Sequence, residues 1–78
     1  MSTDRALVAA RVRTEITAAG TSGLQLSERL GVPYHVMSRR LRGVVPFEAD
    51  QLMAIARELG VSPAVFVDPD SAKTQQPA

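Results

Sequence analysis

The sequence predicts a small all-α domain built from five helices. Three observations support this fold class: apolar residues recur at helical spacing through most of the first 67 residues, a glycine follows each main apolar run, and serines stand where several helices would begin. A chain of 78 residues allows one domain with a thin margin of stability. We expect residues 1–67 to form this domain and residues 68–78, which lack an apolar anchor, to be a disordered tail.

The first predicted helix spans residues 3–19 and ends at Gly20. Its apolar face carries Val8, Val12 and Ile16, widened by Leu7 and Ala19. The second spans residues 23–30. Ser22 and Gln25 predict a capping box at its start, in which each side chain binds a backbone amide of the other residue. Gly31 ends this helix in the left-handed conformation that glycine adopts at little cost.

The third predicted helix spans residues 33–42 and is rich in arginine. Pro33 fits its first position, where a missing N–H does no harm. A rotation of 100° per residue gives this helix an apolar inner face and a cationic outer face. The inner face carries Met37 and Leu41, and the outer face carries His35, Arg39 and Arg42.

The fourth predicted helix spans residues 49–59. With Glu48 as its N-cap, Gln51 is the reciprocal capping-box residue, and Phe47 and Leu52 form a hydrophobic staple. A short fifth helix is expected to begin after Ser62 and to run through Phe66. Across the five helices we expect a core of ten apolar residues: Val8, Val12, Ile16, Leu26, Leu30, Met37, Leu41, Leu52, Ile55 and Leu59.

The net charge of +1 conceals an uneven distribution. Residues 1–44 hold seven arginines against three acidic residues, whereas residues 45–78 hold two basic residues against five acidic ones. A basic N-terminal half indicates a surface that could bind a polyanion such as a nucleic acid. Alternatively, these arginines are ordinary solvent-exposed charges without a partner.

Several classes of protein are disfavoured. The chain has no cysteine, so it has no disulfide or thiolate metal site. It has a single histidine, no glycine-rich phosphate loop and no acid pair fixed by a motif, so we expect no enzyme activity, metal, cofactor or small-molecule ligand. No apolar run approaches the roughly 20 residues that span a bilayer, and the N-terminus lacks the features of a signal peptide. A cytoplasmic protein of a bacterium or an infecting phage is the expectation.

Two segments resemble a known family. LSERLGVPYHVMSRRLRG at residues 26–43 and VPFEADQLMAIARELGVSPAVF at residues 45–66 are similar to the lambda-repressor-like (XRE or Cro-like) DNA-binding domains. The resemblance implies a compact five-helix fold whose second and third helices form a helix-turn-helix. It also implies a transcriptional regulator, often of phage origin, that binds double-stranded operator DNA as a dimer with its third helix in the major groove.

The resemblance assigns site residues to two roles. Base edges would be read by Tyr34, His35 and Arg39, with Val36 against a thymine methyl group. Phosphates would be bound by Ser22, Gly23, Ser38, Arg40 and Arg42. The family commonly has glutamine where this chain has Gly23, so that side-chain contact is missing. Other roles remain open: a phosphate contact or solvent exposure for Arg39, solvent exposure for His35, and a half-buried structural role for Tyr34.

Three functions are weighed. The first is an operator-binding repressor, with nucleoid DNA as its partner. The second is an accessory factor in excision or recombination. The third is an antitoxin-like or adaptor domain whose outer face binds protein. A homodimer on an inverted-repeat operator would have to use residues 61–67 and their neighbours, or the loop at Val44 and Val45.

Overall fold

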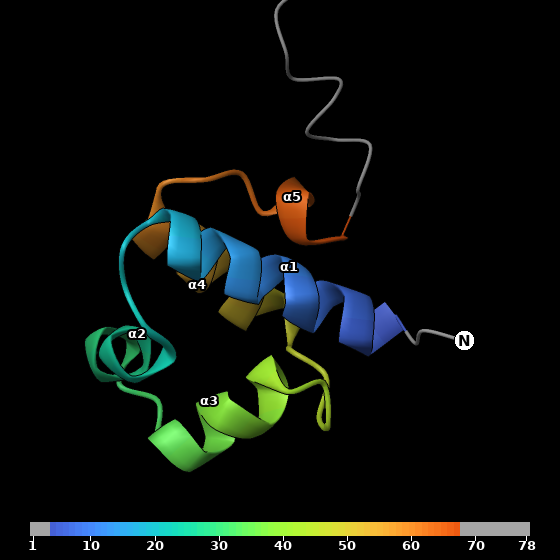
Figure 1. Ribbon diagram of the computed structural model, residues 1–78, viewed down its shortest axis with the longest axis horizontal. Coiled ribbons are helices and arrows are strands. Elements are labelled where there is room, and N and C mark those ends of the chain that lie inside the picture. The colour runs from blue at the N-terminus through green and yellow to red at the C-terminus, as the bar shows by residue number, and fades with distance from the viewer. Residues whose placement is uncertain (1–3, 68–78) are drawn as a thin grey trace, which may run out of the picture.

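The computed structural model describes residues 4–67 (Figure 1). Its helices are α1 (Asp4–Ala18), α2 (Gly23–Leu30), α3 (Tyr34–Leu41), α4 (Ala49–Leu59) and α5 (Ala64–Val67). The described residues contain no strand, so the all-α fold class is confirmed, and the predicted helix boundaries agree closely with the observed ones. The predicted disordered tail at residues 68–78 lies outside the described residues.

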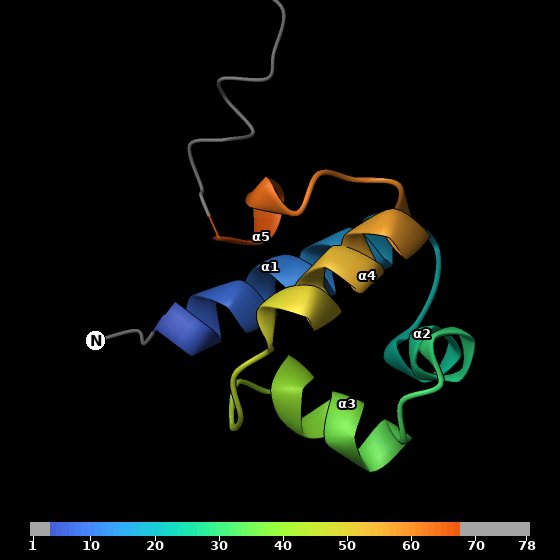
Figure 2. The same cartoon turned by 180° about the vertical axis from the view of Figure 1, so that it is seen from behind.

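The helices are arranged around α1. Helix α5 lies on one side of α1, whereas α2 and α3 lie on the other, as opposite views of the molecule agree (Figures 1 and 2). Helix α1 packs against α5 and α3, and α2 packs against α3 and α4. The face of α3 that points away from α1 is therefore also directed away from α5.

The ten predicted core residues all lie in the hydrophobic core or pack against it, so this prediction is confirmed. Two further apolar residues are buried that the prediction left out. Ala9 of α1 is fully buried, and the Phe66 ring of α5 is 1% exposed. A four-residue helix has little stability of its own, so burial of this ring is what holds α5 against the domain.

Leu7 does not widen the inner face of α1 as predicted. Its side chain is 53% exposed, whereas Ala9 is fully buried. At 100° per residue, Leu7 lies roughly opposite the stripe formed by Ala9, Val12 and Ile16, so it cannot face the same core. Ala19 is also exposed.

The predicted cap of α2 is half confirmed. The Ser22 hydroxyl accepts a hydrogen bond from the Gln25 amide at 3.1 Å, and Gly31 adopts the left-handed conformation. The Gln25 side chain does not complete the box, because its Oε1 accepts from the Thr21 hydroxyl at 2.9 Å. A complete capping box would have this oxygen accept from the Ser22 backbone amide, and that hydrogen bond is not formed among the described residues.

Two other predicted helix starts agree with the structure only in part. Pro33 is the N-cap of α3 and not its first helical residue, because its ψ of 138° is extended. Glu48 is the N-cap of α4 but makes no side-chain cap hydrogen bond. Its carboxylate instead faces the Arg40 guanidinium at 3.5 Å. The predicted cap of α5 is confirmed, since the Ser62 hydroxyl accepts from the Ala64 amide at 3.3 Å.

Gly43 closes α3 with a positive φ of 77°. The Gly43 and Val44 amides donate to the carbonyls of Arg40 and Arg39, which is the double hydrogen bond of a Schellman ending. A Cβ built on Gly43 would lie 3.3 Å from the Cα of Ala6 in α1. Gly43 therefore serves two needs: a left-handed turn and a close approach between backbones.

We predict that Gly43→Ala lowers stability more than Gly31→Ala. Both positions are left-handed, which costs an L-residue about 1–2 kcal/mol. Only Gly43 also meets a backbone atom, whereas a Cβ on Gly31 would find no atom within 4 Å. Urea unfolding of the two variants measures the difference. Equal losses would contradict the proposed close approach to α1.

Candidate functional site

The outer face of α3 is open to solvent. His35, Arg39 and Arg42 are exposed on one side of the helix, while Met37 is fully buried on the other. The predicted division of α3 into an inner apolar face and an outer cationic face is therefore confirmed. None of the other described helices covers the three outer side chains.

The other predicted base-reading residues, Tyr34 and Val36, flank this face together with Ser38, a predicted phosphate ligand. Tyr34 is 49% exposed at the first turn of α3, so its ring divides between protein and solvent. Val36 and Ser38 are half-buried at the edges. The Ser38 carbonyl accepts from the Arg42 amide at 3.0 Å and from Arg42 Nε at 3.4 Å, which draws the Arg42 side chain back along the helix.

The Arg40 side chain, a predicted phosphate ligand, is directed toward α4 and away from the outer face of α3. Its side chain is 17% exposed and lies against the start of α4, where Nη2 faces Glu48 at 3.5 Å and Nη1 donates to Gln51 Oε1. Its Nε is buried without a hydrogen-bond partner among the described residues. This incomplete pairing adds a desolvation cost, so the contact mainly fixes the position of α3 relative to α4.

The start of α2 lies beside α3, as the prediction for Ser22 and Gly23 requires. A Cβ built on Gly23 would lie 2.6 Å from Leu41 Cδ1 and 3.7 Å from Tyr34 Cε1. Glycine at this position therefore lets α3 pack over the first turn of α2. The amides of Gly23 and Leu24 precede the first helical hydrogen bond, as at any helix start, and the positive end of the helix dipole lies here.

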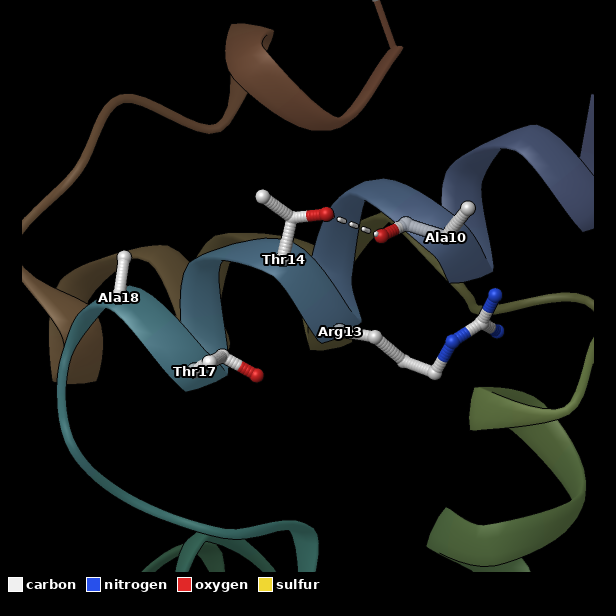
Figure 3. A pocket seen from close by; sticks show the side chains of 5 residues that line it. All are labelled: Ala10, Arg13, Thr14, Thr17 and Ala18. Atoms are coloured by element: carbon white, nitrogen blue, oxygen red, sulfur yellow. Dashed lines mark hydrogen bonds between the residues drawn. The ribbon is translucent and has the colours of Figure 1, made fainter.

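Two arginines from α1 approach the end of α3, and sequence reasoning missed both. Arg5 Nη1 donates to the Val44 carbonyl at 3.2 Å, and Arg13 Nη1 donates to the Leu41 carbonyl. Figure 3 shows Arg13 extending from α1 toward α3. The Leu41 carbonyl lies in the last turn of α3 and carries partial negative charge, so the Arg13 contact stabilises the end of this helix, and both arginines add positive charge beside it. Only the uneven distribution of arginine in the sequence pointed toward this cluster.

A hollow of about 490 Å³ on α1 adjoins Arg13 (Figure 3). Its other lining residues are short, and the Thr14 hydroxyl already donates to the Ala10 carbonyl at 3.0 Å. Across residues 4–67, no three histidine, cysteine or acidic side chains gather closely enough to hold a metal ion. Nor is any described helix long and apolar enough to cross a bilayer.

Comparison with known proteins places the chain in a family. The sequence profile described as the BetR domain matches residues 3–78, which is nearly the whole chain. The chain belongs to the BetR domain family. No curated protein and no solved structure shows a significant match to it. The BetR domain family is distinct from the lambda-repressor-like family that the sequence resembles, so membership neither supports nor opposes that resemblance.

In this BetR domain, the predicted site residues fall into two groups. The structure brings together α3 and the start of α2, with Tyr34 beside Gly23, and Arg13 of α1 contacts the Leu41 carbonyl that precedes Arg42. It separates Arg40 from the outer face of α3 by directing the guanidinium toward α4. The structure thus assembles an exposed cationic face of α3, with the start of α2 packed against Tyr34 and Leu41 and with Arg13 of α1 on the Leu41 carbonyl.

Proposed function

We propose that this protein is a sequence-specific DNA-binding regulator that places α3 in the major groove. In this proposal α2 and α3 act as a helix-turn-helix of the lambda-repressor-like type. The observation that carries it is the exposed row of His35, Arg39 and Arg42 on a helix whose opposite side is buried through Met37. The major groove of B-DNA, about 12 Å wide, admits one α-helix.

Roles for individual residues follow from their positions. Residues near the N-terminus of a recognition helix contact base edges, which fits Tyr34 and His35. Arg39 lies one turn further along the same face and can donate two hydrogen bonds to the O6 and N7 atoms of guanine. Val36 lies at the edge, where it can touch a thymine methyl group.

Phosphates would be held at two places beside α3. The first-turn amides of α2, with the Ser22 hydroxyl nearby, offer N–H donors and a positive dipole to one phosphate. Arg42 offers a guanidinium just after the last residue of α3, and Arg5 and Arg13 contact backbone carbonyls of the same segment. Phosphate contacts of this kind fix the orientation of the protein, and base contacts supply the sequence preference.

The regulatory action would be repression in the cytoplasm. A protein seated on an operator excludes RNA polymerase or a competing regulator, and this needs neither a cofactor nor a catalytic step. An excision or recombination role would use the same surface on an attachment site. The position of the protected sequence, at a promoter or at an attachment site, distinguishes the two.

Two experiments test DNA recognition: selection of bound duplexes from a random pool, and measurement of the Kd of the selected duplex at increasing salt. Duplexes that the protein retains from a random pool give the preferred site, and fluorescence anisotropy then gives its Kd at increasing salt. We expect log K to fall linearly with log salt, with a slope of about −0.9 for each phosphate neutralised. A pool that yields no preferred sequence, or an affinity that is flat in salt, would contradict DNA recognition and favour a protein-binding adaptor.

A further inference from the structure

The Arg40 side chain reaches from α3 to the first turn of α4. Helix α3 packs against α1 and α2, and α2 in turn packs against α4. Among the hydrogen bonds and ion pairs of the described residues, only those of Arg40 join α3 directly to α4. Its Nη1 donates to Gln51 Oε1, and its Nη2 faces the Glu48 carboxylate at 3.5 Å. We call these three residues the α3/α4 contact.

The α3/α4 contact is largely enclosed. The Arg40 side chain is 17% exposed and borders a hollow of about 280 Å³, whose walls also include Leu30 at the end of α2 and Val32 in the turn before α3. The guanidinium therefore lies between three helices. A guanidinium presents its N–H donors in a planar, fixed fork, so engaging two acceptors on α4 defines how α3 is oriented toward that helix.

The contact is poorly built for stability. Arg40 Nε is buried without a hydrogen-bond partner among the described residues, and the Glu48 side chain is 72% exposed. A buried cation with incomplete pairing carries a desolvation cost, and an apolar side chain of similar size at such a place is often neutral or stabilising. What the α3/α4 contact supplies is therefore the orientation of α3.

We propose that Arg40 is a positioning residue for base recognition and does not bind phosphate. The proposal rests on the proposed DNA-binding function. Arg39 directly precedes Arg40 on α3, and its side chain is exposed. Recognition of a base edge requires the reading side chain to be held within about 0.5 Å of its productive position, and supporting hydrogen bonds behind the site provide that precision. By fixing α3 on α4, Arg40 sets the direction from which Arg39 meets a base pair.

A direct phosphate contact is the rival role for Arg40. To reach a phosphate, the guanidinium would have to leave Gln51, and Glu48 would lose the cation that faces it. The two roles differ in what they require of Gln51. A neutral amide releases no counterion from DNA, so Gln51 is irrelevant to a phosphate contact, whereas positioning depends on it.

Binding titrations of Arg40→Met and Gln51→Met separate the two roles. Discrimination is measured as the ratio of the Kd values for the selected duplex and for a duplex changed at the base pair that Arg39 reads. We expect each variant to lower this ratio by roughly threefold or more, which is part of the discrimination that a bidentate base contact supplies. The salt slope should stay at its parent value, and the double variant should lose no more than either single variant, because both changes break one contact.

Arg57→Met is the matched control, because it removes the same charge from the last turn of α4 and should change neither quantity. A phosphate ligand gives a different pattern: Arg40→Met would reduce the magnitude of the salt slope by about 0.9 and leave discrimination intact. That pattern, or a Gln51→Met variant that discriminates as well as the parent protein, would overturn the proposal. Circular dichroism confirms that each variant is folded.

Amide chemical shifts of the free protein test the α3/α4 contact without DNA. Because Gln51 belongs to α4 but holds α3, both variants should move the Arg39 and Arg42 amide resonances in the same direction, and Arg57→Met should leave them in place. A parent protein that binds no duplex would contradict the proposed function, and these shifts would still decide whether the contact orients α3. Resonances of α3 that Gln51→Met leaves unmoved would overturn the positioning role.

Discussion

Replacing Phe66 by alanine should remove about 3–5 kcal/mol from the free energy of unfolding, the range typical of a buried phenylalanine. Phe66 is 1% exposed and lies within the core. It also belongs to a helix of four residues, which is too short to persist without tertiary contacts. Loss of the ring should therefore release α5 from α1 as well as leave a cavity.

The size of this effect is large for a domain of this length. Native domains have about 0.05–0.15 kcal/mol of stability per residue, so a loss of several kcal/mol would leave the variant marginally folded. Urea unfolding followed by circular dichroism measures the change, and Phe66→Leu provides a milder step that keeps the variant in a measurable range. Leu24→Ala, at an exposed site, should change stability by less than about 0.5 kcal/mol. Similar losses for Phe66→Ala and Leu24→Ala would show that α5 does not contribute to the core as described.

Replacing Arg39 by alanine should relax the sequence preference of the protein, with a loss of about 1–3 kcal/mol of discrimination at one base pair. The expectation rests on the central position of Arg39 on the exposed face of α3 and on its freedom from described intramolecular partners. The Arg39→Ala variant should bind the selected duplex more weakly than the parent protein does. Its affinity for that duplex should approach its affinity for a duplex in which the same base pair is changed. Anisotropy titrations with the two duplexes measure both quantities.

Two further arginines serve as controls for this prediction. Arg42→Ala should weaken binding to all sequences alike and reduce the magnitude of the salt slope by about one, because a phosphate contact carries no sequence information. Arg57→Ala removes the same charge from the end of α4, away from α3, and should have little effect on either quantity (Figure 2). If Arg39→Ala and Arg42→Ala weaken every duplex equally, the assignment of Arg39 to base readout is wrong.

The helices themselves were accessible from sequence because their signals are local. Ser22 caps α2 three residues before Gln25, and glycines end the helices at positions that the apolar periodicity already marked. The inner and outer faces of α3 follow from a rotation of 100° per residue, which needs no knowledge of the other helices. Predictions of this kind depend on a few neighbouring residues, so the structure agrees with them.

Predictions that needed contacts between distant residues were less successful. Glu48 could have capped its own helix, but Arg40 competes for its carboxylate, and no pattern in sequence reports that approach. The same is true of Arg13, whose acceptor Leu41 is 28 residues away. Leu7 is a different case, because its position opposite Ala9 was already implied by helical rotation, and hydrophobicity was given more weight than angle.

The hydrogen bonds of the arginines also have a consequence for electrophoretic and ion-exchange behaviour. Arg40 shares its charge with Glu48, so that pair contributes little to the field outside the protein. Arg5 and Arg13 use N–H groups on backbone carbonyls, which are uncharged, and so they keep their full positive charge at long range. Arginine thus has two separable structural effects in this small domain. Arg40 joins α3 to α4 with its charge largely neutralised, whereas Arg5 and Arg13 join α1 to the segment that ends α3 and remain able to attract an anionic matrix.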